Sequence, residues 1–314
     1  MKIRNLLGGI ASYIPALYKL FSRGTGGTIS ARYCYSVWLR HLVMAYKNGL
    51  LTYPETIAEL GPGDSLGIGL AALICGANKY YAFDVVEYAS SKRNIEIFDE
   101  LVDLFKKREK IPDETEFPRV RPLLESYKFP SNILTNERLD KTLKQDRIES
   151  IKNALQTLDS RDNNNIQISY FVPYYNSNII EVESIDMIYS QAVLEHVDNL
   201  AYTYEALYRW LKPGGFMSNE IDFTCHGIAK EWNGHWAYSD IVWKLIKGKR
   251  SYLINRQPHS FHIDLLRKSG FKIIYDSRTK NTSGIQRKHL ASKFKNISDD
   301  DLVTNSAFIQ AIKK

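Results

Sequence analysis

A glycine-rich segment, Ile57-Ala-Glu-Leu-Gly-Pro-Gly-Asp-Ser-Leu-Gly-Ile-Gly69, lies in the first quarter of the chain. A short apolar run leads into the acidic Glu59, Gly61 and Gly63 follow at alternate positions, and a helix of small residues is expected to begin around Ser65. A strand, a tight turn and a helix N-terminus in this order are typical of α/β sheets that bind an adenosine-containing cofactor. The segment therefore predicts such a sheet, with a ligand at the loop after its first strand.

Charge and spacing indicate which ligand this is. A carboxylate at Glu59 would repel the pyrophosphate of a dinucleotide, but it would pair with the α-ammonium of S-adenosylmethionine. The dinucleotide pattern G-x-G-x-x-G requires a third glycine where this chain has Leu66. Asp84 ends the next apolar run, about 20 residues on, where a carboxylate is suited to the ribose hydroxyls. We expect S-adenosylmethionine as the cofactor, with a nicotinamide oxidoreductase as the disfavoured alternative.

Three later segments extend the pattern. They are Ile185-Asp-Met-Ile-Tyr-Ser-Gln-Ala-Val-Leu-Glu-His-Val197, Leu211-Lys-Pro-Gly-Gly-Phe216 and Leu266-Arg-Lys-Ser-Gly-Phe-Lys-Ile273. In this order and spacing the chain resembles the class I, Rossmann-like, S-adenosylmethionine-dependent methyltransferases, in particular bacterial enzymes that act on small molecules and glycans. The resemblance covers roughly residues 55–314, with an unusual insertion.

The resemblance implies a set of cofactor-binding residues. These are Glu59, Gly61, Gly63, Ser65, Asp84 and Gln191. The two carboxylates would bind the methionine amine and the ribose, the two glycines would lie under the methionine and the sugar, and Gln191 would lie near the methionine end. Ser65 stands where many family members carry a third glycine. Residues 174–176 offer aromatics and an amide where the family often has an acidic residue for the adenine amine, so the adenine contact is left unassigned.

Apolar runs alternate with helical patterns along the chain. Strands are expected near 56–60, 79–84, 166–171, 184–189, 215–221, 271–276 and 305–312, and helices near 1–23, 30–48, 65–76, 88–107, 136–158, 191–194, 200–211 and 259–269. This alternation predicts an α/β fold with a mostly parallel sheet. The resemblance implies a Rossmann-like sheet of seven strands in which the last is antiparallel.

The domain organisation follows from charge and from two long connections. Residues 1–54 are expected to form a basic helical N-terminal extension and residues 55–314 the methyltransferase domain. Insertions at about 105–160 and 222–258 follow the second and fifth strands. Because ligands bind at the carboxyl ends of strands in such sheets, both insertions are expected to form a lid over an acceptor pocket.

The overall composition suits a large folded domain. The chain has 314 residues, 44% of them hydrophobic, with three distant cysteines and no apolar run of membrane-spanning length. We expect a reducing, cytoplasmic location. Residues 1–54 contain seven Lys and Arg and no Asp or Glu, which equals the net charge of +7 of the whole chain. Such a segment either forms a solvated helical cap or brings residues 1–23 to an anionic membrane surface.

Polar residues after the fourth and fifth strands are the candidates for acceptor chemistry. Transfer of a methyl group to a hydroxyl requires in-line positioning and removal of a proton, for which histidine is the usual base near neutral pH. The candidate catalytic residues are His226, Asp222 and His196, and the candidate substrate contacts are His235, Trp236, Asn255 and Arg256. Glu195, His196, Asp222 and His226 have side chains that suit a divalent ion, but no tight ligand motif such as H-x-x-x-H occurs. No metal is therefore expected.

The favoured function is methyl transfer to a small or glycan acceptor, with a hydroxyl of a cell-surface saccharide preferred. A quinone or other prenylated lipid acceptor is the alternative within the same class. A nucleic-acid acceptor is not expected, because Ser190-Gln-Ala-Val193 replaces the Asn/Asp-Pro-Pro-aromatic motif of base methyltransferases and no nucleic-acid-binding motif appears. A non-catalytic protein of the same fold, acting in an assembly, is the alternative from another class.

Overall fold

The structure is a computed structural model that describes residues 3–13, 27–158, 166–173, 176–250 and 253–314. The chain divides into two compact units, each formed by several segments. Unit 1 contains residues 1–23, 192–205 and 220–309, and unit 2 contains residues 24–191, 206–219 and 310–314.

Seven strands form one sheet. They are β1 (Thr56–Leu60), β2 (Lys79–Phe83), β3 (Gln167–Phe171), β4 (Ile185–Gln191), β5 (Leu211–Asp222), β6 (Phe271–Lys280) and β7 (Thr304–Lys313). Their order is β3-β2-β1-β4-β5-β7-β6. In unit 2, β1 pairs in parallel with both β2 and β4, and β2 with β3. The prediction of a Rossmann-like, mostly parallel sheet of seven strands with an antiparallel last strand is confirmed.

The helices follow the expected alternation. Unit 2 contains α3 (Ala31–Lys47), α4 (Gly67–Cys75), α5 (Ser91–Lys107), α6 (Asn136–Thr142), α7 (Gln145–Gln156) and the short η1 (Ser177–Ile179), and α8 (Leu200–Trp210) begins in unit 1 and ends in unit 2. Unit 1 contains α1 (Ile3–Ala11), α9 (Asp240–Lys247), α10 (His259–Lys268), α11 (Asp299–Val303) and the short η2 (Leu194–His196), η3 (Gly234–Ala237), η4 (Arg287–His289) and η5 (Ser292–Phe294).

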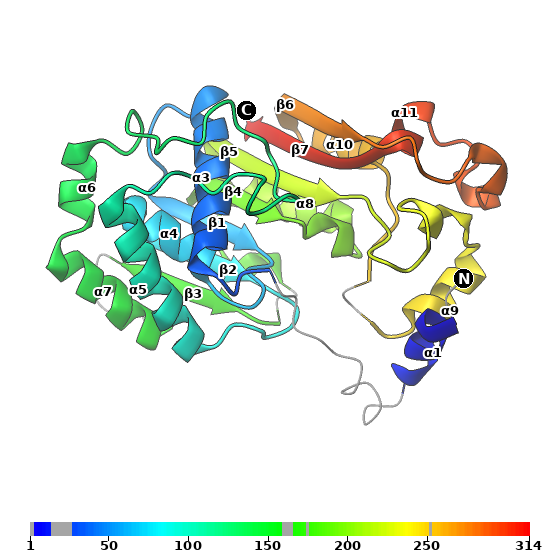
Figure 1. Cartoon of the computed structure of the whole chain (residues 1–314), viewed down its shortest axis with the longest axis horizontal. Coiled ribbons are helices and arrows are strands. Elements are labelled where there is room, and N and C mark those ends of the chain that lie inside the picture. The colour runs from blue at the N-terminus through cyan, green and yellow to red at the C-terminus, as the bar shows by residue number, and fades with distance from the viewer. Residues whose placement is uncertain (1–2, 14–26, 159–165, 174–175, 251–252) are drawn as a thin grey trace. The chain divides into compact units, whose positions relative to one another are not determined.

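Helices α3, α4 and α5 pack against one another, and α4 lies on β1 and β2 (Figure 1). Two glycines of α4 permit this close approach. A Cβ atom on Gly67 would lie 2.5 Å from Sγ of Cys34, and one on Gly69 would lie 2.1 Å from the ring of Tyr80. The glycines of this segment therefore serve two purposes. The earlier ones form the predicted turn, and Gly67 and Gly69 let α4 pack closely on its neighbours.

Helix α3 belongs to the core of unit 2. Trp38, Leu39 and Arg40 have no exposed surface. The guanidinium of Arg40 donates hydrogen bonds to the carbonyl oxygens of Pro112, Val120 and Pro122, at 2.8 to 3.2 Å. One charge of the basic N-terminal segment thus fixes the first insertion against α3 instead of meeting solvent.

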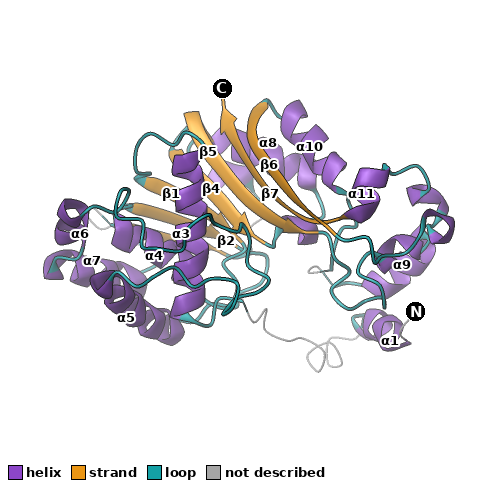
Figure 2. Ribbon diagram, turned by 45° about the horizontal axis from the view of Figure 1, so that its top comes forward, coloured by secondary structure: helices purple, strands orange, loops and turns teal. Residues whose placement is uncertain are grey.

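Unit 1 contains two tight contacts between elements. Helix α10 lies along β6, as Figure 2 shows. Helix α1 packs on α9, where a Cβ atom on Gly9 would lie 2.0 Å from the carbonyl oxygen of Leu245 and one on Gly248 would lie 2.2 Å from that of Gly9. Ser12 continues this contact by accepting a hydrogen bond from the amide of Lys249 at 2.8 Å.

Three details of the predicted secondary structure were wrong. No helix spans 191–194, because β4 continues to Gln191 and a single 3₁₀ turn, η2, follows. The stretch 136–158 forms two helices, α6 and α7, since the chain leaves helical geometry at Lys144. Helix α4 begins at Gly67 and not at Ser65, which is held by a neighbouring segment described below.

Parts of the N-terminal segment and of two loops lie outside the described residues. These are residues 14–26, 159–165 and 174–175, the last of which belong to the segment considered for the adenine contact. Among the residues that the structure does describe, no helix combines the length and the apolar character needed to cross a membrane.

Candidate active site

The loop between β1 and α4 has the conformation that its glycines predict. Gly61 and Gly63 have φ angles of 65° and 74°, a left-handed backbone that favours glycine. The amide of Gly61 donates to the carbonyl oxygen of Phe83 at 2.8 Å, which joins the loop to the end of β2. The first and second strands therefore end side by side. At Gly61 and Gly63, where the loop turns, no Cβ atom covers the backbone.

Residues outside the loop hold it in place. The amide of Ser65 donates to Oγ1 of Thr28 at 2.8 Å, and that hydroxyl donates to the carbonyl oxygen of Pro62, also at 2.8 Å. The hydroxyl of Ser65 donates to the carbonyl oxygen of Thr28. The amide of Leu66 donates to Oδ1 of the buried Asn94 at 2.9 Å. Ser65 is fully buried, so its visible contribution is to fix the start of α4.

Glu59 is almost completely buried at the end of β1. Its Oε2 accepts hydrogen bonds from the hydroxyl of Tyr80 at 2.5 Å and from that of Tyr189 at 3.1 Å. Burial raises the pKa of Glu59 to about 7, although the two tyrosine hydroxyls oppose this shift. The carboxyl group is thus close to the midpoint of its titration at neutral pH, and neither tyrosine binds its Oε1.

Asp84 follows β2 and is partly buried. Its Oδ1 accepts from the amides of Val85 at 2.7 Å and Val86 at 3.4 Å. Burial raises the pKa of Asp84, and the backbone amides of Val85, Val86 and Gly63 act in the opposite direction. The carboxylate therefore lies beside the glycine loop, where the sequence placed it.

Gln191, at the end of β4, belongs to a network that the sequence did not reveal. Its Oε1 lies 3.0 Å from Nε2 of the fully buried His41, whose Nδ1 lies 2.8 Å from Oγ of Ser218. Burial lowers the pKa of His41 to about 4, so the imidazole is neutral. The neutral imidazole therefore bridges Gln191 and Ser218, with one ring nitrogen donating and the other accepting. In the sequence, this network was signalled only by a single histidine, His41, among the apolar residues of α3.

A second group of candidate residues lies in unit 1. Oδ2 of Asp222, the last residue of β5, lies 3.4 Å from Nε2 of His226. His226 has a φ of 47° and Gly227 a φ of 77°, so the chain reverses directly after the strand and returns the imidazole toward Asp222. The rings of His226 and His196 meet edge to face, with centroids 5.1 Å apart. About one third of each histidine side chain is exposed.

Glu195 completes this group, and it was not among the predicted catalytic residues. Its Oε1 lies 4.0 Å from Nε2 of His196, and its side chain is 3% exposed. Neither carboxyl oxygen has a hydrogen-bond partner in the part of the chain that the structure describes. Burial, followed by the nearby Glu220 and Asp222, raises the pKa of Glu195 well above its usual value, and the nearby backbone amides of Glu195 and Asp222 oppose this rise.

Asn255 holds the backbone of this group. Its side-chain amide donates to the carbonyl oxygens of Leu194 at 2.8 Å and Val197 at 2.9 Å. Its backbone amide donates to the carbonyl oxygen of Glu195 at 2.6 Å. Asn255 was predicted to contact substrate. The structure shows it bound to the backbone on both sides of Glu195 and His196, and its contact with substrate stays a prediction.

Arg256 and its neighbours form a buried cluster in unit 1. The guanidinium donates to Oδ1 of Asp240 at 2.5 Å and to the carbonyl oxygen of Tyr238 at 2.8 Å, and it stacks over Trp243. Nε1 of the fully buried Trp236 donates to the carbonyl oxygen of Arg256 at 2.9 Å. Packing thus accounts for Trp236 and Arg256, and substrate contact by these two residues stays a prediction.

His235, the remaining predicted substrate contact, is also buried. Burial, then the charge of Arg256, lowers the pKa of His235 to about 3, so its imidazole is neutral. The predicted residues therefore fall into two sets. Glu59, Gly61, Gly63, Ser65, Asp84 and Gln191 lie in unit 2, and His196, Asp222, His226, His235, Trp236, Asn255 and Arg256 lie in unit 1.

Comparison with known proteins was made at the level of sequence families and of structures. Residues 147–218, from α7 to β5, match a family described as a methyltransferase domain. This segment is therefore similar to methyltransferase domains. The sheet order places the glycine loop after the interior strand β1. No curated protein matches the sequence of this chain significantly.

Solved structures similar to this chain come from diverse organisms. An S-adenosylmethionine-dependent methyltransferase from Mesorhizobium loti is 13% identical with a TM-score of 0.42, over 87% of this chain and 98% of that one. One from Methanosarcina mazei is 13% identical with a TM-score of 0.43, over 87% and 96%. Phosphoethanolamine N-methyltransferase 2 from Haemonchus contortus, in complex with S-adenosyl-L-methionine, is 13% identical with a TM-score of 0.42, over 90% and 57%.

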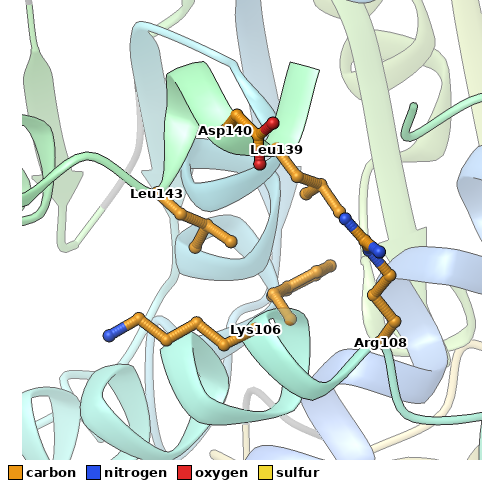
Figure 3. A pocket seen from close by; sticks show the side chains of 6 residues that line it. Lys106, Arg108, Leu139, Asp140 and Leu143 are labelled. Carbon is orange, nitrogen blue, oxygen red and sulfur yellow. The ribbon is translucent and has the colours of Figure 1, made fainter. Parts of the chain in front are cut away.

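A hollow on the surface of unit 2 is distinct from the glycine loop. It lies between the end of α5, with Lys106 and Arg108, and Leu139, Asp140 and Leu143 in and after α6 (Figure 3). Because a helix that follows a parallel strand runs back along the sheet, the end of α5 lies at the edge opposite the loop. This hollow is therefore separate from the predicted cofactor site.

Proposed function

We propose that S-adenosylmethionine binds at the loop after β1, with its ribose on Asp84 and its α-ammonium on Oε1 of Glu59. The left-handed Gly61 and Gly63 let the cofactor approach the backbone closely. The amides around Asp84 fix its carboxylate beside that loop. Gln191, oriented by the neutral His41, lies near the methionine end.

We propose a hydroxyl of a saccharide as the methyl acceptor. The observation that carries this proposal is the Asp222–His226 pair at the end of β5, where Oδ2 and Nε2 are 3.4 Å apart. A neutral hydroxyl is a weak nucleophile, and it needs a group that accepts its proton as the methyl group arrives. A carboxylate that orients an imidazole supplies such a group, and partial exposure of both residues leaves them accessible to an acceptor.

The proposed step is a single in-line displacement. The acceptor oxygen forms a bond to the methyl carbon while the bond from sulfur to that carbon breaks. The proton of the hydroxyl passes to the Asp222–His226 pair, and neutral S-adenosylhomocysteine leaves. The main contribution of the protein is to align oxygen, carbon and sulfur.

An acceptor screen tests this function. The full chain is incubated with radiolabelled S-adenosylmethionine and three panels: sugar nucleotides with surface-glycan fragments, quinols with other prenylated phenols, and small amines. Label transferred to a saccharide hydroxyl supports the proposal. Transfer to a prenylated acceptor supports the alternative, and label on amine nitrogen contradicts a role for hydroxyl activation.

A variant tests the roles of the pair. His226→Ala should lower kcat on the order of 100-fold, the usual contribution of a general base, and leave the Kd for S-adenosylmethionine within about twofold. His289→Ala, which changes an exposed histidine of η4, is the matched control and should leave both unchanged. If His226→Ala weakens cofactor affinity as much as turnover, the residue is structural.

We also propose a cytoplasmic enzyme whose residues 1–23 contact an anionic membrane surface. Leu7, Ile10 and Tyr13 in and after α1 are more than half exposed. Residues 1–23 carry four Lys and Arg and no acidic residue. Removal of residues 1–23 should abolish sedimentation with phosphatidylglycerol vesicles. Unchanged sedimentation would contradict the membrane proposal.

A non-catalytic role in an assembly is the alternative from another class. Measured turnover by the full chain would exclude it.

A further inference from the structure

We propose that Glu195, His196 and His226 form a binding site for one divalent transition-metal ion, with zinc as the best-matched ion. Each residue offers one ligand atom, and these three atoms lie within 4.8 Å of one another. The sequence predicted no metal, because two of the ligands are adjacent and the third is 30 positions later, a spacing that forms no tight motif. The fold nevertheless brings all three together within unit 1.

The buried carboxyl group of Glu195 is the observation that points to an ion. Its side chain is 3% exposed, and neither oxygen is hydrogen-bonded within the described parts of the chain. A buried carboxyl group is ionised in native structures only where it is paired or coordinates a metal, and otherwise it is neutralised by protonation. A dication at the centre of the three residues would stabilise the ionised form of Glu195 directly.

The ligand types favour a transition metal over magnesium. Two imidazoles and one carboxylate are a common ligand set for catalytic zinc and for other divalent transition metals, and they leave coordination positions open for a substrate. Magnesium prefers oxygen ligands and keeps its water. Partial exposure of both histidines leaves the open side of the site accessible.

Surrounding residues support the ligands in the way that metal sites require. Asp222 lies 3.4 Å from Nε2 of His226, and a second carboxylate commonly orients a metal-bound imidazole through its other nitrogen. Asn255 fixes the backbone on both sides of Glu195 and His196 by three hydrogen bonds. The ligands are therefore held in place before an ion arrives.

The role of the ion rests on the proposed function. An acceptor hydroxyl bound to the ion would be more acidic than a free one, because the positive charge would stabilise the developing alkoxide. With His226 as a ligand, Asp222 of the pair would take the proton while the oxygen–methyl bond forms, the sulfur–methyl bond breaks and S-adenosylhomocysteine leaves. Neither an oxidant nor a reductant is needed.

Metal content tests the site without any substrate. The full chain, purified without a polyhistidine tag, is stripped with a chelator, incubated with zinc chloride, passed through gel filtration and analysed by mass spectrometry for bound zinc. We expect about one zinc per chain in the wild type and in the control His289→Ala, and little in Glu195→Gln or His226→Ala. Addition of Co²⁺ should give the visible absorption of a low-coordinate cobalt site, which both ligand variants should lose.

A graded variant and two clear failures complete the test. Asp222→Asn should bind zinc 10- to 100-fold more weakly, as expected for loss of a supporting carboxylate. A wild type without zinc, or equal zinc in Glu195→Gln and the wild type, overturns the site. Zinc binding without methylation of any saccharide leaves the site and refutes the proposed function, whereas the reverse result refutes only the site.

Discussion

Glu59 accepts hydrogen bonds from two tyrosine hydroxyls in the core of unit 2, yet it also lies at the start of the cofactor loop. Burial raises its pKa to about 7, so the group is largely neutral at pH 5.5 and half ionised near pH 7. In the proposed binding mode, the cofactor ammonium pairs with the ionised carboxylate, so binding at low pH displaces a proton. This binding mode links cofactor affinity to pH through Glu59.

This linkage predicts a pH-dependent Kd. Affinity for S-adenosylmethionine should rise on the order of tenfold from pH 5.5 to 7, below the range in which the α-ammonium loses its own proton. Glu59→Gln should bind more weakly and show no rise, and Glu96→Gln, on the exposed side of α5, should behave as the wild type. Calorimetry at four pH values checks this. An equal rise in Glu59→Gln would mean that another group is responsible.

At the scale of elements, the glycine-rich segment needs glycine for two different reasons, backbone conformation at some positions and close packing at others. Gly61 and Gly63 have left-handed backbone, whereas Gly69 is helical and lies against the ring of Tyr80. Sequence reasoning assigned the first pair correctly to a turn. It could not show that the later glycines permit helix α4 to approach α3 and β2, because that requirement comes from residues distant in the chain.

A single methyl group tests the packing of α4. Gly69→Ala should lower the free energy of unfolding by about 1–3 kcal/mol, since the added Cβ forces the Tyr80 ring or the helix to move. Gly27→Ala adds the same atom where nothing lies within 4 Å, and it should be nearly neutral. Urea unfolding measures both. Equal effects of the two changes would show that α4 does not depend on this approach.

Two arginines of α3 offer a matched comparison of buried and exposed charge. Arg40→Met should cost about 3 kcal/mol, because it leaves three carbonyl oxygens of the first insertion without their donor. Arg32→Met removes a surface ion pair with Glu116 and should cost less than about 1 kcal/mol. Urea unfolding of both variants is the measurement. Similar small losses would show that Arg40 does not anchor the insertion.

At the scale of the whole molecule, the strands were predictable and the site only partly so. Every strand is marked locally by an apolar run, and for this reason all seven lie close to their predicted positions. His41 was missed because its environment arises from tertiary contacts, since it meets Gln191 across 150 positions of sequence. Glu195 was noted only as a side chain that suits a divalent ion, and its burial close to His226 becomes visible only in the fold.

Burial also changes how several predicted residues are interpreted. His235, Trp236 and Arg256 suggested a binding surface by residue type alone. In the structure they pack against one another and against Asp240 and Trp243, with little exposed surface. Residue type indicates what a side chain can bind, but only the fold decides whether it faces solvent or the interior.

Isothermal titration calorimetry of the full chain with S-adenosylmethionine and, separately, with NAD is the most direct measurement. The predicted result is saturable binding of about one S-adenosylmethionine per chain at pH 7, strongly weakened in Asp84→Ala, and no binding of NAD. Binding of NAD, with no heat from S-adenosylmethionine, would contradict the assignment of the glycine loop and the enzyme class together.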